Sequence, residues 1–285
     1  MRRSLRETAG IHERWNSVPT YASLKRNMPP RKLTELLGEL QNVIASTTER
    51  QDCYAAGQAM SSRIAACLPL VRRLKVGGVA SPWQASVQSR ALEPKSLCTV
   101  LEERAGIDAS VYFFLGCAAY PRGDVAIVLH SRTAQSVASS FWPFDTGSLG
   151  SHLQSTNGSA LDSDAQDEAF RKYWGSGADV SQFAEVFLAA HFAVPIQYVR
   201  CGQTGSPDFP AYHGLMSRDN DRRAWTVEVQ AHEVVSLAKE SGHLKTIIVQ
   251  RHQLLDELPD DLSEFGKVAN DVAAGVREEI EQLCM

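Results

Sequence analysis

The sequence predicts a mixed α+β fold with a mostly antiparallel sheet, preceded by a helical N-terminal segment. Two apolar runs, residues 109–116 and 124–131, are joined through "CAAYPRG", and such runs around a Pro/Gly turn are typical of paired strands. Residues 225–232 alternate strictly between apolar and polar side chains, which predicts a half-buried strand. Apolar residues at helical spacing in "RKLTELLGELQNVIAS" predict a helix near the N-terminus.

The balance of charges changes sign near residue 80. Residues 1–80 hold 13 Lys and Arg against 6 Asp and Glu, whereas residues 81–285 hold 16 against 27. "KVGGVASPW" at this point is typical of a linker. We therefore expect a basic helical segment over residues 1–80 and an α+β domain over residues 81–285. The basic segment is expected either to meet an acidic partner or to form an ordinary solvated helical surface.

The remaining elements follow from local patterns. A second N-terminal helix is expected over residues 54–68, ended or kinked by Pro69. Asp179 is a candidate N-cap for a later helix, and the Gly- and Ser-rich stretch 141–178 is expected to be a functional or mobile loop. Further strands are expected over residues 84–92, 196–200 and 244–250, and further helices over residues 94–106, 180–192 and 262–284.

Several function classes are not expected from this composition. No window approaches eighteen consecutive apolar residues, so no membrane span and no membrane partner are expected. The charged N-terminus predicts no secretory signal, and six scattered cysteines without a C-x-x-C pair suit a reduced, cytoplasmic protein. The histidines show no metal-ligand spacing, and no P-loop or dinucleotide-binding glycine motif is present.

The alternating strand places a carboxylate on its polar side. Trp225, Val227 and Val229 share one face, whereas Glu228 lies on the other with its polar neighbours. Glutamate is disfavoured in strands, so two interpretations remain open. Glu228 is either a functional carboxylate or part of the exposed face of an edge strand.

The order of three segments resembles that of a known enzyme family. These segments are "SVQSRALEPKSLCTVLEERAGI", "SVYFFLG" and "TVEVQAHEVVSLAKESGHLKTIIV". From about residue 84 to residue 250 the chain resembles ADP-ribosyltransferases, in particular the bacterial toxin branch that modifies nucleic acids. The resemblance implies an ADP-ribosyltransferase-like sheet core and a catalytic Glu228, with Glu233 as the alternative catalytic acid.

The same resemblance implies NAD as a substrate and suggests which residues bind it. Arg90 and Gln88, on the expected first strand, are the candidates for gripping the diphosphate and ribose. Tyr112 is the candidate for stacking on nicotinamide, with Tyr120 a weaker one. "FWPFDTGSLGSH" is a candidate substrate loop. The alternatives are core packing of the aromatics, a solvated strand face for Gln88 and Arg90, and a plain spacer for the loop.

The predicted function is therefore NAD-dependent ADP-ribosyl transfer by a cytoplasmic toxin or defence effector. Its acceptor is expected to be nucleic acid, such as a single strand, or protein, and a neutralising antitoxin is an expected partner. One carboxylate suffices, because it can stabilise the positive charge that develops as the glycosidic bond to nicotinamide breaks. The alternative prediction is a non-catalytic binding or scaffold protein of a toxin–antitoxin-like system.

Overall fold

The fold is built on one large, strongly twisted sheet. The computed structural model describes residues 32–38, 59–77, 82–95, 109–117, 123–143, 145–146, 174–191, 198–199 and 226–284. Within these residues the sheet has eight strands in the order β10-β9-β4-β1-β3-β7-β5-β6, and every pair except β10–β9 is antiparallel. The bounds are β1 Leu70–Leu74, β3 Val111–Leu115, β4 Val125–Leu129, β5 Ser140–Trp142, β6 Gly175–Ser176, β7 Glu228–Ala231, β9 Leu244–Val249 and β10 Gly266–Val268. The expectation of a mixed, mostly antiparallel α+β fold is confirmed.

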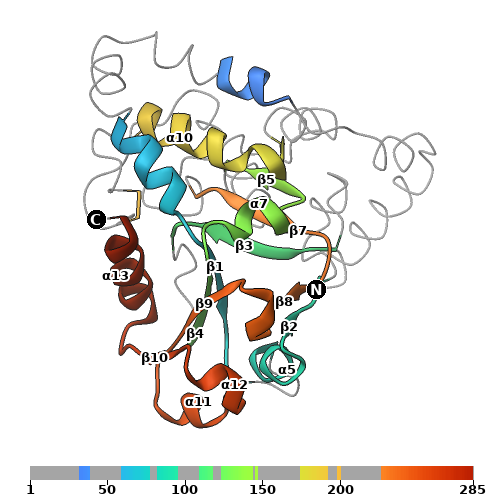
Figure 1. Ribbon diagram of the computed structural model, residues 1–285, viewed down its shortest axis with the longest axis vertical. Helices are drawn as coiled ribbons and strands as arrows, with labels where there is room; N and C mark the ends of the chain where they lie inside the picture. The colour runs from blue at the N-terminus through green and yellow to red at the C-terminus, as the bar shows by residue number, and fades with distance from the viewer. Residues whose placement is uncertain are drawn as a thin grey trace, which may run out of the picture.

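Strand β1 lies at the centre of this sheet. It pairs with β3 through Val71 opposite Phe114, and with β4 through Val71 opposite Val128. Figure 1 shows β1, β4 and β9 running nearly vertically, with β3 and β7 crossing above them. The boundary expected near residue 80 therefore falls after the first strand of the sheet, and residues 70–74 belong to the same core as the later strands.

The expected strand over residues 84–92 is wrong. Residues Pro82–Ser89 form helix α5, and only Ala91–Leu92 is extended, as β2 pairing with β8 (Val235–Ser236). Trp83 and Val87, one helical turn apart, are both buried, and Pro82 starts the helix at the position that proline favours. Arg90 has a positive φ of 53° and ends the helix in the left-handed conformation.

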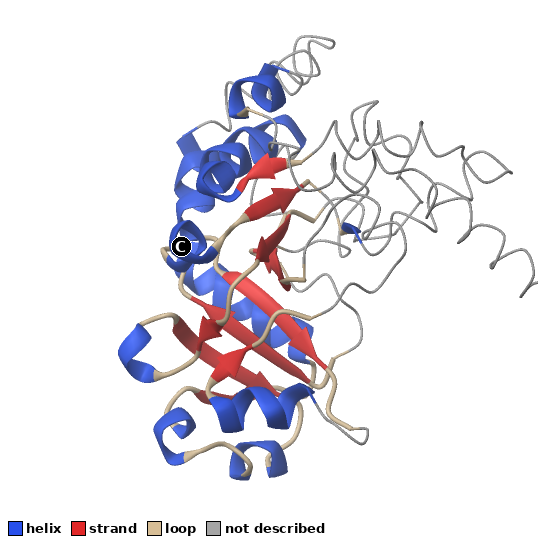
Figure 2. Cartoon of the chain, turned by 90° about the vertical axis from the view of Figure 1, so that its right-hand side faces the viewer, coloured by secondary structure: helices blue, strands red, loops and turns tan. Residues whose placement is uncertain are grey.

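Helix α10 (Val180–His191) covers the apolar face of the upper strands. Phe113, Val229 and Phe141 lie side by side in register and are fully buried. The Phe141 ring packs on Phe183 of α10 with centroids 4.7 Å apart. Helix α10 confirms the helix expected over residues 180–192, and the helical residues 59–67 confirm part of the second N-terminal helix. Figure 2 shows helices along one side of the upper strands and around the lower end of the sheet.

Two further expected segments, a strand over residues 196–200 and a loop over residues 141–178, are described in part. Of the expected strand 196–200, only Tyr198 and Val199 are described, and they form a turn, which contradicts a strand at these two residues. The 141–178 loop carries strand residues at both described ends, in β5 and β6.

The described residues also form short helices, which are α7 Thr133–Val137, η2 Gly177–Asp179, η6 Lys239–Ser241 and α11 Gln253–Asp256. The helix expected over residues 94–106 lies outside the described residues, apart from Pro94 and Lys95.

The continuous closing helix expected over residues 262–284 is also wrong. The chain forms α12 (Asp260–Ser263), then β10, then α13 (Val272–Cys284). Residues 266–268 are extended because they pair with β9, with Gly266 opposite Ile247. Asp271 Oδ1 accepts hydrogen bonds from the Ala273 and Ala274 amides, which is the N-cap geometry that starts a new helix.

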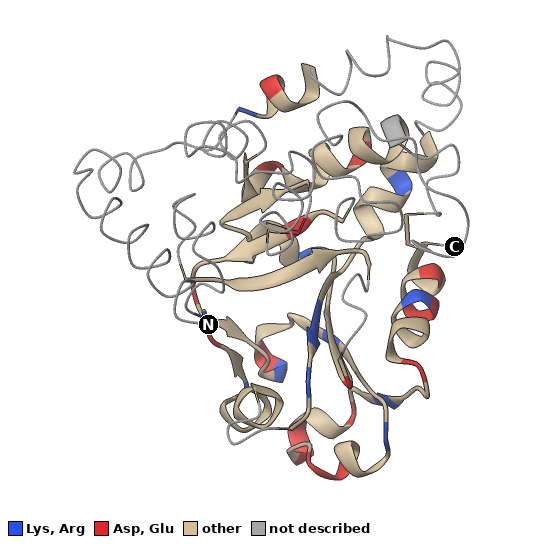
Figure 3. Cartoon of the chain, turned by 180° about the vertical axis from the view of Figure 1, so that it is seen from behind, with Lys and Arg blue, Asp and Glu red and all other residues tan. Residues whose placement is uncertain are grey.

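Glu279 joins α13 to the sheet edge through two lysines. Its carboxylate binds Lys267 Nζ at 2.5 Å and Lys245 Nζ at 3.3 Å, and Glu279 is only 8% exposed. Burial pushes the pKa of Glu279 upward, but the lysines, Lys267 first, outweigh it and hold this pKa below its ordinary value of 4.5. Figure 3 shows the mixed acidic and basic ribbon of α13.

Acidification is therefore expected to remove stability at this site. A carboxyl group with a lowered folded-state pKa contributes stability that is present above its unfolded pKa and is lost as the pH falls through the folded value. The free energy of unfolding of wild type should fall more steeply than that of Glu279→Gln when the pH is lowered from about 6 to about 3. Urea titrations of both proteins at each pH measure this, and parallel pH profiles would contradict it.

Candidate functional site

Strand β7 presents Glu228 inside the sheet, between β3 and β5. In register, Phe114 of β3 and Trp142 of β5 lie on either side of Glu228. One step along, Tyr112 and Ser140 flank Gln230 in the same way. Residues opposite one another in antiparallel strands point to the same face, so these six side chains share one face of the sheet. The opposite face carries the apolar row covered by α10.

A chain of hydrogen bonds holds the Glu228 carboxylate. Ser140 Oγ donates to Gln230 Oε1 at 3.0 Å, and Gln230 Nε2 donates to Glu228 Oε1 at 2.9 Å. Thr146 Oγ1 donates to the same carboxylate oxygen at 2.8 Å, and the Thr146 amide donates to Oε2 at 3.3 Å. Thr146 and Gln230 donate directly to Glu228, and Ser140 donates to Gln230. We call Glu228, Gln230, Ser140 and Thr146 the Glu228 cluster.

The Glu228 cluster is withdrawn from solvent. Glu228 is 2% exposed, and the other three residues are 1% exposed. The expectation of a half-buried strand with a solvated polar row, and with it the edge-strand interpretation of Glu228, is therefore wrong. Asp145, directly before Thr146, is also buried. A buried carboxylate is held in place only when donors satisfy it, and here the cluster supplies them.

The structure brings Tyr112 to this cluster. Tyr112 is half-buried on the same face, directly opposite Gln230, and its backbone carbonyl accepts a 2.7 Å hydrogen bond from Arg72 Nη1. Phe113 points to the other face and is fully buried in the core. Glu233 is exposed, in the bend after β7, and Tyr120 lies outside the described residues.

The structure does not bring Gln88 and Arg90 to the cluster. Gln88 is exposed on α5, and Arg90 forms a two-pronged ion pair with Asp261 of α12, at 2.7 and 2.8 Å. This partner raises the pKa of Arg90 and lowers the pKa of Asp261 through the hydrogen bond they share. Figure 1 shows α5 and α12 together at the bottom of the molecule, with β7 in its upper half. Their expected strand is a helix, so the expected gripping surface beside Glu228 is not formed by these residues.

Of the residues in the Glu228 cluster, only Gln230 could be placed beside Glu228 from the sequence pattern. Gln230 follows Glu228 by two residues, so alternation alone places both on one face. Ser140 and Thr146 are 90 and 82 residues from their partners, and only strand pairing and a folded loop end bring them in. Thr146 does lie in the segment "FWPFDTGSLGSH" that was expected to form a substrate loop.

Replacing Ser140 with alanine tests whether the chain of hydrogen bonds stabilises the fold. The variant leaves the buried side-chain oxygen Oε1 of Gln230 without its Ser140 donor, which should lower the free energy of unfolding by about 1–2 kcal/mol. Ser89→Ala is the matched control, because Ser89 is exposed at the end of α5 and surface changes usually cost under about 0.5 kcal/mol. Equal urea midpoints for the two variants would show that the Ser140 bond contributes nothing.

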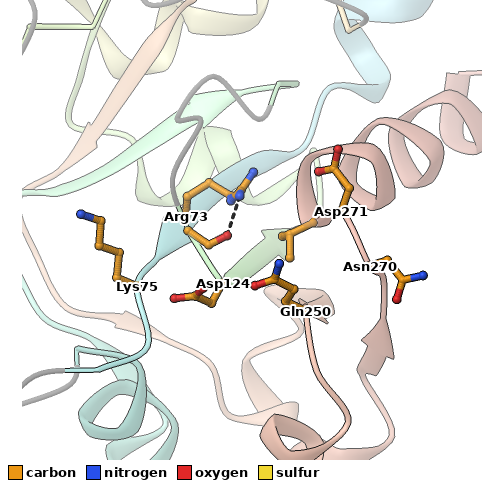
Figure 4. Close-up of a pocket in the computed structure, with 8 residues that line it drawn as sticks. Arg73, Lys75, Asp124, Gln250, Asn270 and Asp271 are labelled. Carbon is orange, nitrogen blue, oxygen red and sulfur yellow. Dashed lines mark hydrogen bonds between the residues drawn. The ribbon is translucent and has the colours of Figure 1, made fainter.

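A second polar feature lies at the lower end of the sheet. A pocket of about 370 Å³ is bounded by β1, β4, β9 and the start of α13, and its charged lining residues are Arg73, Lys75, Asp124 and Asp271. Figure 4 shows the Arg73 guanidinium bonded to the Gly123 carbonyl, at 2.6 Å, with Asp271 beyond it. Burial lowers the pKa of Arg73, partly offset by Asp271 and Asp124. The positive and negative charges of the lining balance, so the pocket favours no single ligand charge.

Comparisons with known proteins do not assign the chain to a family. Neither protein-family models, nor curated proteins, nor solved structures match the chain. Among the described residues no group of three His, Cys, Asp or Glu side chains is placed to hold a metal ion. Within that same part of the chain, every helix is too short or too polar to cross a bilayer.

Proposed function

We propose that the Glu228 cluster is the catalytic centre of an NAD-dependent ADP-ribosyltransferase. The observation that carries this proposal is the Glu228 carboxylate itself, buried on an interior strand and oriented by three hydrogen bonds. A preorganised carboxylate in a site with little water stabilises developing positive charge far better than one in bulk solvent. Tyr112, on the same face, is the aromatic candidate for covering nicotinamide.

The chemistry asked of Glu228 is limited. The bond between the ribose C1′ and the nicotinamide nitrogen breaks, and its electron pair leaves with nicotinamide. The carboxylate stabilises the oxocarbenium-like ribosyl group, and an acceptor hydroxyl or amine then bonds to C1′ and loses its proton. A ribose hydroxyl must exchange for one of the Thr146 hydrogen bonds to reach Glu228, because both carboxylate oxygens are engaged.

The set of residues expected to hold NAD fits only in part. Glu228 and Tyr112 share a face, but Gln88 and Arg90 lie on α5 and the turn that follows it. The proposal therefore assigns no role to Gln88 or Arg90 in gripping the diphosphate.

The test uses NAD labelled in its adenylate part. Wild type and Glu228→Gln are each incubated with labelled NAD and with single-stranded DNA, RNA or cell lysate as the acceptor. Transfer of label by wild type, lost in the variant while its circular dichroism spectrum is unchanged, supports the proposal and identifies the acceptor class. Equal labelling by both proteins would remove Glu228 from the mechanism.

The second candidate function is a non-catalytic binding or scaffold protein of a toxin–antitoxin-like system. The observation that favours it is the same burial, because a fully hydrogen-bonded Glu228 with 2% exposure is also what a structural carboxylate requires. The two candidates differ in one measurable respect. A binding protein releases no nicotinamide from NAD, whatever acceptor is present.

A further inference from the structure

Two cysteine thiols meet where two helices end. Cys67 is the last of the helical residues 59–67, and Cys284 is the last residue of α13. Arg63, one helical turn before Cys67, donates from Nη2 to the Cys284 carbonyl at 3.0 Å, so this face of the helix contacts the end of α13. Cys67 lies on the same face of its helix as Arg63, near enough to Cys284 to raise the pKa of that thiol, and Figure 1 shows the two helix ends close together on one side of the molecule.

The two thiols differ in their surroundings. Cys284 is 6% exposed and belongs to the hydrophobic core, whereas Cys67 is half-buried against that core. Burial, and then the neighbouring Cys67, raise the pKa of Cys284 to about 12. At neutral pH Cys284 therefore remains a protonated thiol, and the thiol that solvent reaches is Cys67. Thiolates, not thiols, attack disulfides, so reaction has to begin at Cys67.

We propose that Cys67 and Cys284 form a thiol–disulfide site that reacts with low-molecular-weight disulfides. The Cys67 thiolate attacks one sulfur of the external disulfide, whose S–S bond breaks and releases one thiolate, which takes a proton from water. Cys284 then gives its proton to water and attacks the Cys67 sulfur, releasing the second external thiol. The two cysteines are oxidised to one disulfide, and the external disulfide is reduced to two thiols. This site is independent of the Glu228 cluster.

The bridge would join two segments that are far apart in sequence. Helical residues 59–67 lead directly into β1, and α13 packs on β4 and β9. A disulfide between their ends restricts the unfolded chain over most of its length, so oxidation should raise the melting temperature by about 5 °C. Reversal by a thiol reductant should return it to the starting value.

The test incubates the purified full chain with oxidised glutathione, blocks the remaining thiols by alkylation and maps the tryptic peptides by mass spectrometry. The expected product is a peptide pair linked through Cys67 and Cys284. Cys284→Ser should instead stop at a mixed disulfide of glutathione on Cys67, because it lacks the second thiol. Cys67→Ser should give neither product. Cys117→Ser is the control and should behave as wild type, because Cys117 is buried beside Thr226.

Three results would overturn the site. One is full alkylation of Cys67 in wild type after oxidation. Another is a bridge from either cysteine to Cys53, Cys98 or Cys201. The third is the same glutathione adduct in wild type and in Cys284→Ser. The peptide map of wild type decides the question even when a variant folds poorly.

Discussion

Replacing Glu228 with glutamine is expected to lower NAD cleavage by about 10²–10³-fold, the loss typical when one preorganised electrostatic group is removed from a catalytic site. The substitution keeps the shape of the side chain but removes its negative charge. A neutral amide cannot stabilise a developing oxocarbenium ion as a carboxylate does. Nicotinamide release, measured at a temperature where both proteins are folded, gives the ratio of rates.

The free energy of unfolding of the same variant is expected to fall by about 1–3 kcal/mol. The side-chain NH2 group of the new glutamine would face a buried N–H donor where the carboxylate had offered an acceptor. An amide nitrogen in place of Oε2 faces the Thr146 N–H, and one in place of Oε1 faces the Gln230 amide. Glu233→Gln is the matched control, since Glu233 is exposed beside the same strand; it should change neither rate nor stability. If Glu233→Gln abolishes cleavage and Glu228→Gln does not, the assignment of the catalytic acid is reversed.

Ser140→Ala separates loss of charge from loss of stability. It weakens the same chain of hydrogen bonds but leaves the Glu228 carboxylate in place. Its loss of cleavage should therefore be much smaller than that of Glu228→Gln. Equal losses in the two variants would indicate that the cluster acts only as a structural support.

Replacing Gly177 with alanine is expected to destabilise the fold by about 1–3 kcal/mol or more, through overpacking against backbone. A Cβ at this position would lie 2.2 Å from the Ala138 carbonyl oxygen and 2.4 Å from its carbon. Those atoms cannot rotate away as a flexible side chain would. A displacement of Gly177 should extend to the Glu228 cluster through two backbone hydrogen bonds. The Gly177 amide donates to the Ser139 carbonyl, and the Ser139 amide donates to the backbone carbonyl of Gln230.

Gly38→Ala is the matched control for this substitution. Gly38 is helical, and a Cβ there meets nothing within 4 Å. Alanine is favoured over glycine in helices by about 1 kcal/mol, so this variant should be neutral or more stable than wild type. Urea denaturation of both variants measures the difference. A Gly177→Ala protein as stable as Gly38→Ala would mean that η2 does not pack on residue 138 as described.

Strands with strongly apolar or strictly alternating sequences were predictable from the chain. Strands β3, β4, β7 and β9 all lie within such runs, because residues buried on both faces of an interior strand leave a continuous apolar signal. The choice between an interior and an edge position for β7 was not predictable. It depends on β5 pairing with β7, and β5 comes from a segment that local composition marks as a loop.

Two of the wrong elements have identifiable physical causes. In α5 only Trp83 and Val87 are buried, so a short, polar helix carries almost no periodic signal. At the C-terminus, helical spacing continues in the sequence through β10, but β10 pairs with β9 and the Asp271 cap starts a separate helix. Tertiary contacts override the helical periodicity at the C-terminus.

Of the candidate site, Glu228 and Tyr112 were found from the sequence and are brought together by the β3–β7 register. Gln88 and Arg90 were assigned to a strand that is a helix, so they lie elsewhere. Thr146 and Ser140 reach Glu228 and Gln230 only through the fold, and nothing in their own sequence neighbourhood identifies their partners.

The most direct measurement is nicotinamide release from NAD by the folded wild-type protein, with and without single-stranded nucleic acid and protein acceptors. An ADP-ribosyltransferase centred on Glu228 releases nicotinamide above the no-protein background in at least one of these conditions. No release under any of them, from protein that unfolds cooperatively in urea, would contradict the proposed activity and leave Glu228 as a structural carboxylate.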